Sequence, residues 1–219
     1  GIEIIDPKSD KEKARRIQFA EFYWKKRQRK GVTLASAQDS MMHRNYFSPM
    51  LVETGYADAM ISGLSRNYPD TLRPAIEIIG KKEGAKLVSG MYIIITKDGP
   101  YFLADCTVNK NPTAEEMVEI TLQTAFAIEQ FKIKPRIAFV SYSNFGSNDG
   151  AIPQKQRDAV AILHKEYPEL IVDGEMQVNV ALDPEILQES FPFSKLIGGT
   201  ANTLIFRYLT AGIIAYNVL

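Results

Sequence analysis

The first candidate for chemistry is an arginine beside a predicted helix start. Arg73 lies in the run Asp70-Thr-Leu-Arg-Pro74. With Asp70 or Thr71 as the N-cap, Arg73 falls in the first turn, where free N–H groups and the helix dipole favour anions. A guanidinium can also hold a phosphate through two parallel hydrogen bonds. The run predicts an anion site, although a solvated or structurally paired arginine would have the same spacing.

A second group of cations closes the first predicted helix. Arg27, Arg29 and Lys30 stand just before Gly31. Cations at a helix C-terminus are favoured by the helix dipole, which is sufficient reason for their presence. The functional alternative is a contact with the phosphate of a nucleotide-like ligand.

A polar loop follows a predicted buried strand at residues 136–141. The loop, Ser143-Asn-Phe-Gly-Ser147, leads into a helix, and open α/β sheets bind ligands in crevices at such junctions. Asn144, Gly146 and Ser147 are therefore weaker candidates for ligand contacts. The run is neither a G-x-G-x-x-G fingerprint nor a P-loop, so a plain connecting loop explains it at least as well.

The remaining chemistry-bearing residues give weaker signals. Asp173 and Glu175 follow a predicted strand and suit metal binding or acid–base work, but capping of the next helix is the simpler alternative. Cys106 ends an apolar strand and is predicted to be a buried small hydrophobe. His43 and His164 are isolated in the sequence, which indicates neither a catalytic triad nor a His/Cys zinc site.

The elements that would position these residues alternate between helices and strands. Thr113-Ala-Glu-Glu116 has the pattern of a capping box, and Asp98-Gly99 between two β-rich runs is typical of a hairpin. The alternation favours an α/β fold with a partly parallel sheet and a boundary near residues 81–84. Helices are predicted over 10–30, 33–44, 47–53, 70–79, 113–132 and 153–166. Strands are predicted over 57–61, 87–96, 100–107, 136–141, 170–172 and 203–206, and an apolar, helix-compatible run ends the sequence at 211–219.

Composition limits which binding partners and which cellular compartment are expected. Lys plus Arg and Asp plus Glu both number 26, so the net charge is zero and no bulk attraction to nucleic acid or an anionic membrane is expected. The apolar runs are too short to span a bilayer, and the N-terminus has no signal-peptide pattern. The single cysteine suits a reducing environment. These features predict a cytoplasmic protein.

Four groups of segments together resemble the phosphate acetyltransferase (phosphotransacetylase) family, with order and spacing that agree over nearly the whole chain. They are Lys26-Arg-Gln-Arg-Lys-Gly-Val-Thr33; Ala57-Asp-Ala-Met-Ile-Ser-Gly63 with Asp70-Thr-Leu-Arg-Pro74; Asp173-Gly-Glu-Met-Gln177 with Ala181-Leu182; and Ala201-Asn-Thr-Leu-Ile-Phe206 with Ala211-Gly-Ile-Ile-Ala-Tyr216. The resemblance implies a two-lobed, three-layer α/β/α architecture similar to isocitrate and isopropylmalate dehydrogenases, here truncated at its C-terminus. Residues 1–83 would form part of the first α/β lobe, and residues 84–219 the second.

A closer resemblance is to the phosphotransacetylase-like C-terminal domain of large bacterial malic enzymes. It rests on residues 104–115, on Ser143-Asn-Phe-Gly-Ser147 and on Asn217, where stand-alone enzymes typically have lysine. In such hybrids an N-terminal portion, absent from this sequence, oxidatively decarboxylates malate with NADP and a divalent metal, Mg or Mn. The C-terminal domain is associated with acetyl-CoA regulation and oligomerisation. The resemblance therefore implies acetyl-CoA or CoA as ligand, no cofactor in this chain, and as partners a second copy (homodimer or higher) and the malic enzyme domains.

The resemblance transfers roles to a few positions. Arg73 matches the family arginine at the acyl/phosphate centre, Arg27 matches one implicated in CoA binding, and Ser62, Gly63 and Thr71 line the same region. The family's catalytic Ser-Arg pair and a following aspartate are expected beyond the last residue of this sequence.

Two departures from the family pattern accompany the missing catalytic pair, and no candidate base for the CoA thiol is evident in the sequence. Arg207 replaces the family's usual proline, and Ile213 replaces its usual asparagine. The expectation is ligand binding with little or no acetyl transfer. A working phosphate acetyltransferase and a purely structural oligomerisation module are the alternatives.

Overall fold

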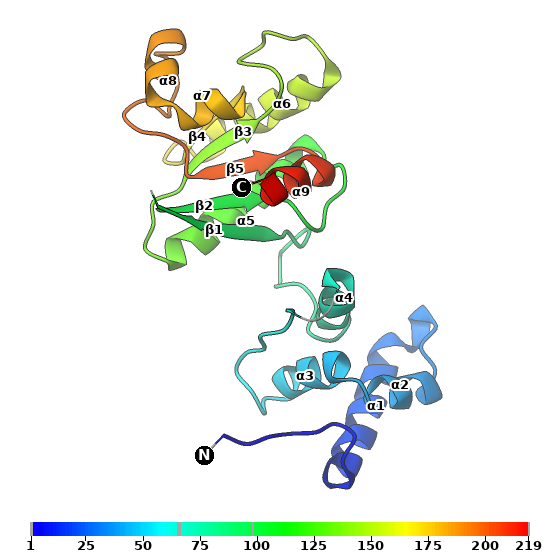
Figure 1. Ribbon diagram of the computed structural model, residues 1–219. Coiled ribbons are helices and arrows are strands. Elements are labelled where there is room, and N and C mark those ends of the chain that lie inside the picture. Colours follow the sequence, from blue (N-terminus) through cyan, green and yellow to red (C-terminus); the bar gives the residue numbers. More distant parts are fainter. Residues whose placement is uncertain (1, 65–66, 98, 219) are drawn as a thin grey trace. The chain divides into compact units, whose positions relative to one another are not determined.

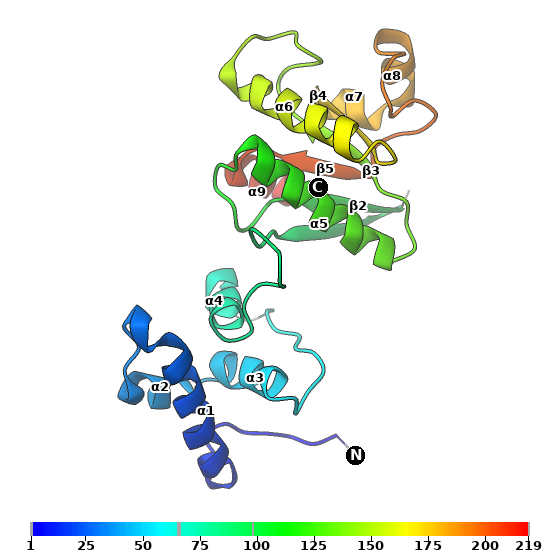
Figure 2. The ribbon, with the colours of Figure 1, turned by 180° about the vertical axis from the view of Figure 1, so that it is seen from behind.

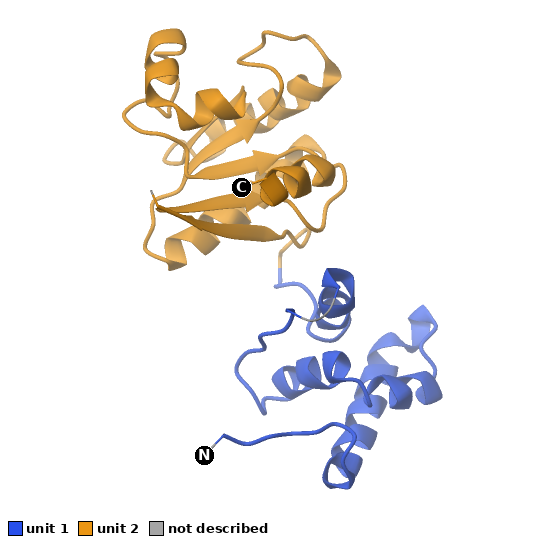
Figure 3. Cartoon of the chain, viewed as in Figure 1, with its two compact units in different colours: residues 1–83 blue, residues 84–219 orange. Residues whose placement is uncertain are grey.

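In the computed structural model the chain forms two compact units, residues 1–83 and 84–219 (Figure 3). The structure describes residues 2–64, 67–97 and 99–218. Each unit has its own core of buried apolar side chains.

The first unit is built from helices. Its core joins Phe19 and Tyr23 with Phe47, Met50 and Ile78, and the Phe19 and Phe47 rings lie 5.1 Å apart. Its helices are η1 (Asp10–Glu12), α1 (Lys13–Arg27), η2 (Gln28–Lys30), α2 (Leu34–Ser40), α3 (Arg44–Glu53) and α4 (Tyr68–Ile78) (Figure 1). The start predicted for the second helix is confirmed, because Thr33 is the N-cap of α2 and its side chain accepts a hydrogen bond from the Ser36 N–H.

The strand predicted at residues 57–61 is wrong. The N–H groups of Tyr56 and Ala57 donate to the Leu51 carbonyl at 2.8 and 3.1 Å, which closes α3 instead of starting a ladder. Ile61 is fully exposed, and the described residues of this unit contain no strand with which the segment could pair.

Helix α4 begins before the predicted position. Asn67 is the N-cap and Pro69 lies in the first turn, where a missing N–H is tolerated. Arg73 is consequently in the second turn of α4, and its predicted first-turn position is wrong.

The second unit is organised around one mixed sheet. Its strands are β1 (Met91–Thr96), β2 (Gly99–Ala104), β3 (Arg136–Val140), β4 (Ile171–Met176) and β5 (Thr203–Phe206). Their order is β1-β2-β5-β3-β4, with β1 and β2 as an antiparallel hairpin and the other pairs parallel. The predicted hairpin and partly parallel sheet are confirmed.

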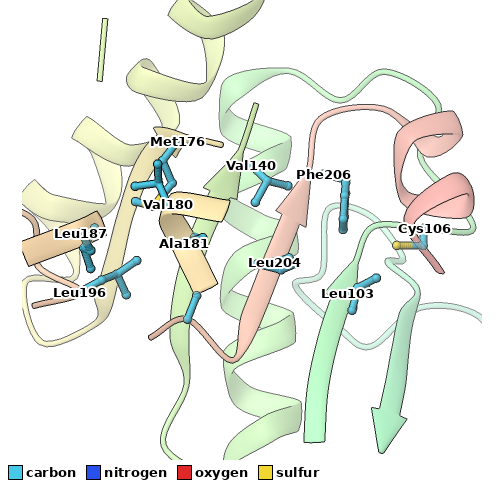
Figure 4. Packing of buried hydrophobic residues seen from close by; sticks show 12 residues of the cluster. Leu103, Cys106, Val140, Met176, Val180, Ala181, Leu187, Leu196, Leu204 and Phe206 are labelled. Carbon is cyan, nitrogen blue, oxygen red and sulfur yellow. The ribbon is translucent and has the colours of Figure 1, made fainter. Parts of the chain in front are cut away.

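Helices cover both faces of this sheet, which gives three α/β/α layers (Figures 1 and 2). They are α5 (Ala114–Gln130) and α6 (Ala151–Glu166) on one face, and α7 (Val178–Leu182), α8 (Pro184–Ser190) and α9 (Leu209–Val218) on the other. Successive strand residues alternate between the faces: Leu103 and Leu204 join the cluster under α7–α9, drawn in Figure 4, whereas Ala104 and Ile205 join the opposite one.

Two predictions from local sequence are confirmed in this unit, and a third is wrong. Thr113 caps α5 in a capping box with Glu116, and Cys106 is fully buried, both as predicted. Strand β4 is longer than predicted, so Asp173 and Glu175 lie inside it and not after it. Their proposed role as caps of the next helix is therefore wrong.

The order of connections creates a switch point in the sheet. Strand β3 leads to α6 on one face, and its neighbour β5 leads to α9 on the other. Chains that leave adjacent strands in opposite directions open a crevice beyond the strand ends, where open α/β sheets bind ligands.

Candidate functional site

Arg73 lines an open pocket of about 200 Å³ in the first unit. The pocket is lined by His43, Arg44, Asn45, Tyr46, Asp70, Arg73 and Pro74. The Arg73 side chain is exposed, and in the part of the chain that the structure describes it has neither a hydrogen bond nor an ion pair. An arginine in this state is available to an incoming anion.

The pocket also lies at the start of a helix. Arg44 and Asn45 are the first two residues of α3, and His43 is its N-cap without a capping side-chain bond. The positive end of the α3 dipole adds to the charges of Arg44 and Arg73. The expected pairing of an arginine with a helix N-terminus is thus present, but the helix is α3 and not α4.

Sequence analysis missed three residues of this pocket. It ended the second helix at Arg44 and began the third at Phe47, which placed His43 and Arg44 at the end of one helix and Asn45 in a connecting segment. A helix start at Arg44 would have placed a cation in the first turn, and this was the available signal. His43, isolated in the sequence, lines the Arg73 pocket.

Arg27 is held in a polar network behind the pocket. Its Nη2 lies 3.1 Å from Glu77 Oε1, and the Tyr23 hydroxyl donates to Glu77 Oε2 at 2.7 Å. Burial, with the nearby Glu77, raises the pKa of Tyr46, which donates to the same carboxylate. Arg27 and Arg73 line one shared hollow with Glu77, so the structure brings the two predicted arginines together with the Arg27 charge already compensated.

The other residues assigned to the same region lie at different places. Ser62 and Gly63 line a separate hollow together with Arg44 and Asn45, which also line the Arg73 pocket. The Thr71 hydroxyl is buried and has no hydrogen-bond partner among the described residues.

The loop candidates of the second unit form hydrogen bonds with one another and with residues at the end of β4. Asn144 Oδ1 accepts from the Gln177 N–H at 2.7 Å, and Ser147 Oγ accepts from the Asn144 N–H at 2.9 Å. The Gly146 N–H donates to Glu175 Oε1 at 3.0 Å. These polar groups hold the loop against the end of β4.

The paired acidic residues have internal partners as well. Asp173 Oδ2 accepts from the Ser194 hydroxyl and the Lys195 N–H at 2.9 and 2.8 Å. Glu175 is fully buried and forms an ion pair with Arg157 at 3.0 Å. No group of three or more His, Cys, Asp or Glu side chains among the described residues is placed to hold a metal.

Comparison with known proteins defines the class. A family model described as phosphate acetyl/butaryl transferase matches residues 1–219. The chain belongs to this family, and it is a phosphotransacetylase-like α/β domain.

Individual relatives agree with this class. A phosphate acetyltransferase of Bacillus subtilis is 37% identical over 100% of this chain and 66% of its own length. An NADP-dependent malic enzyme of Haemophilus influenzae is also 37% identical over 100% of this chain, but over 28% of its own length. The solved EutD phosphotransacetylase from Staphylococcus aureus superposes with a TM-score of 0.81 and 32% identity, covering 100% of this chain and 66% of that one.

The chain thus spans two thirds or less of these relatives. Among the described residues, no helix has the length and apolar character that a membrane crossing requires.

Proposed function

We propose that this chain is the phosphotransacetylase-like domain of a hybrid NADP-dependent malic enzyme and binds acetyl-CoA or CoA as a regulatory and oligomerisation domain. Acetyl transfer by the domain would be slow or absent. NADP and the Mg or Mn ion would serve the malate-oxidising portion of the hybrid and not this domain.

The observation that carries the binding role is Arg73, which has no ion pair with a described residue and lines a pocket at the start of α3. Coenzyme A carries phosphate groups, and exposed arginines beside a helix N-terminus are suited to bind them. Arg44 adds a second guanidinium to the same pocket. Arg27 would contribute once a ligand phosphate competes with Glu77 for its guanidinium.

The second candidate is a working phosphate acetyltransferase. Several curated relatives have that name, and His43 in the Arg73 pocket offers a general base for the CoA thiol. In that reaction the thiolate sulfur attacks the acetyl carbon of acetyl phosphate, the carbon–oxygen bond to phosphate breaks, and phosphate leaves.

Calorimetric titration of acetyl-CoA into the chain tests the binding role. We expect Arg73→Ala to weaken binding roughly ten- to a hundredfold, the range for loss of a charge-assisted hydrogen bond. Lys13→Ala, which removes an exposed cation elsewhere in the first unit, is the matched control and should bind like the parent chain. Equal affinities of the Arg73 variant and the parent chain would refute the assignment.

Acetyl-CoA formation from acetyl phosphate and CoA separates the two candidates. The full-length protein should show little formation if the domain is regulatory, while acetyl-CoA changes its malate oxidation. Turnover at ordinary enzymatic rates that His43→Ala abolishes would instead establish the transferase.

A further inference from the structure

We propose that the second unit binds a small organic acid with a hydroxyl or ammonium group, in the crevice beyond the carboxyl ends of β3 and β5. The crevice has a volume of about 290 Å³ and is lined by Val140, Ser141, Tyr142, Ile152, Gln156, Val178, Phe206, Arg207, Tyr208 and Ala211. All of these residues belong to the second unit, and none of them lines the Arg73 pocket.

Arg207, the cation of this crevice, forms no ion pair with any carboxylate that the structure describes. Arg207 is only 9% exposed, and its Nε and Nη1 atoms are buried without a hydrogen-bond partner among the described residues. Its guanidinium carbon lies 4.2 Å from the centre of the Tyr208 ring, a contact that orients the group but satisfies none of its N–H donors. A buried guanidinium is unfavourable unless an anion pairs with it, so Arg207 points to an anionic ligand.

Two more buried polar atoms of this crevice have no hydrogen-bond partner within the described ranges of the chain. They are the Ser141 hydroxyl oxygen and Gln156 Oε1. The Gln156 amide is fixed, because its Nε2 donates to the Val140 carbonyl at 2.8 Å. Its Oε1 is therefore a free acceptor, which a ligand would satisfy with an O–H or N–H donor.

The rest of the crevice selects a compact, partly apolar ligand. Val140, Ile152, Val178 and Phe206 supply hydrocarbon walls, and the volume suits a molecule of a few carbons better than a nucleotide. Inorganic phosphate would leave these walls without a partner. A carboxylate on a short carbon chain satisfies both the guanidinium and the walls.

The position in the fold is that of a ligand site. Val140 and Phe206 are paired residues at the ends of β3 and β5, and Figure 4 shows them on neighbouring strands. The chain leaves these strands toward opposite faces, which is the switch-point geometry. Because the family usually has proline in place of Arg207, the family resemblance does not imply this cation.

The surrounding charge also favours an anion. Burial, followed by the nearby Arg207 charge, lowers the pKa of Lys155 on α6. The Lys155 ammonium is held by the Asn111 side chain and the Pro112 carbonyl, at 2.9 and 2.8 Å, and not by a carboxylate. Lys155 therefore adds a second positive charge near Arg207, and the nearby Glu116 carboxylate acts against it.

The test is a titration of four probes followed by ¹H–¹⁵N NMR of the 219-residue chain. The probes are 2-hydroxybutyrate, butyrate without the donor, butane-1,2-diol without the carboxylate, and inorganic phosphate. We expect 2-hydroxybutyrate to shift the Arg207 Nε–H signal and the Ser141 amide signal, with a dissociation constant on the order of 1 mM. Butyrate should bind about fivefold more weakly, and the diol and phosphate should leave both signals in place.

Variants assign the effect to Arg207. Arg207→Met keeps the apolar volume, so it should abolish the shift of Ser141 while the unliganded chain stays at least as stable as the parent. Arg207→Lys keeps the charge and should retain weakened binding, whereas Arg73→Ala should leave the titration unchanged. The proposal is overturned if no organic acid shifts these signals, if phosphate shifts them as strongly, or if Arg207→Met binds like the parent. Marked destabilisation by both Arg207 variants would show that the arginine is structural, and this would also overturn the proposal.

Discussion

Removal of Arg157 should destabilise the second unit through a buried carboxylate. Glu175 is fully buried, and its Oε1 receives hydrogen bonds from the Ser143 hydroxyl, the Gly146 N–H and Arg157 Nη1 at 2.7, 3.0 and 3.0 Å. In Arg157→Ala the two neutral donors remain, but the charge loses its only cation among the described residues.

The magnitude follows from the burial of the two partners. Leaving one partner of a buried ion pair uncompensated typically lowers the unfolding free energy by about 3–5 kcal/mol. The Arg157 side chain is 24% exposed, so water can partly replace it. We therefore expect about 3 kcal/mol, at the lower end of that range. Glu175→Gln in the Arg157→Ala background removes the uncompensated charge, and the pair should show a coupling of about 1–3 kcal/mol.

Urea unfolding followed by far-ultraviolet circular dichroism measures these differences, with hydrogen exchange of the β3 and β4 amides as a local measure. Glu169→Ala is the matched control, because Glu169 is exposed and should change the unfolding free energy by less than about 0.5 kcal/mol. Strictly additive effects of the two substitutions, or an Arg157→Ala effect no larger than that of the control, would refute the reasoning.

Three further predictions concern the core and the caps of the second unit. Burial, with the nearby Asp105 charge, raises the pKa of Cys106 from 9.0 to about 12, so a thiol reagent at pH 8 should react with the unfolded chain only. Since the folded thiol keeps its proton to higher pH than the unfolded one, its contribution to stability should be lost as the pH rises from 9.0 to about 12, which unfolding titrations can check. Gly212→Ala would place a methyl group 2.6 Å from Cys106 Sγ. We expect it to lower the free energy of unfolding, measured in urea, by about 1–3 kcal/mol, and Cys106→Ala should recover part of this loss. Thr113→Ala removes the acceptor for the Glu116 N–H and should lower stability by about 1 kcal/mol in thermal melts, and an unchanged melting temperature would contradict the cap.

Two features of the second unit were predictable from short stretches of sequence, and one was not. The hairpin of β1 and β2 was predictable because Asp-Gly between two β-rich runs restricts the connection to tight turns. The capping box at Thr113 was predictable because its partners are three residues apart. Strand order was not predictable, since β5 inserts between β2 and β3 and pairs with segments distant in sequence.

Three other features could not be predicted from short stretches of sequence. Ala57 to Ile61 has the composition of a buried strand, but a strand also needs a partner for its N–H and C=O groups. Arg73 was recognised from its own run, whereas the pocket around it depends on α3, which comes from another segment. Asp173 and Glu175 were interpreted as ligand-binding groups or helix caps, because the partners that let them be buried inside β4 are 21 and 18 residues away in the sequence.

The sequence by itself determined the class of the protein, its alternation of helices and strands, and Arg73 as a candidate for anion binding. The class follows from the resemblance of short segments to a family, and the other two follow from periodicity, capping and short runs of residues. Only the tertiary structure decided which groups meet: Arg73 with the start of α3, Arg27 with Glu77, and Arg207 with the crevice beyond β3 and β5. The physical reason is that a counter-charge or a hydrogen-bond partner is a matter of distance in space. Whether a cation is neutralised or remains available to a ligand is settled only when distant segments pack together.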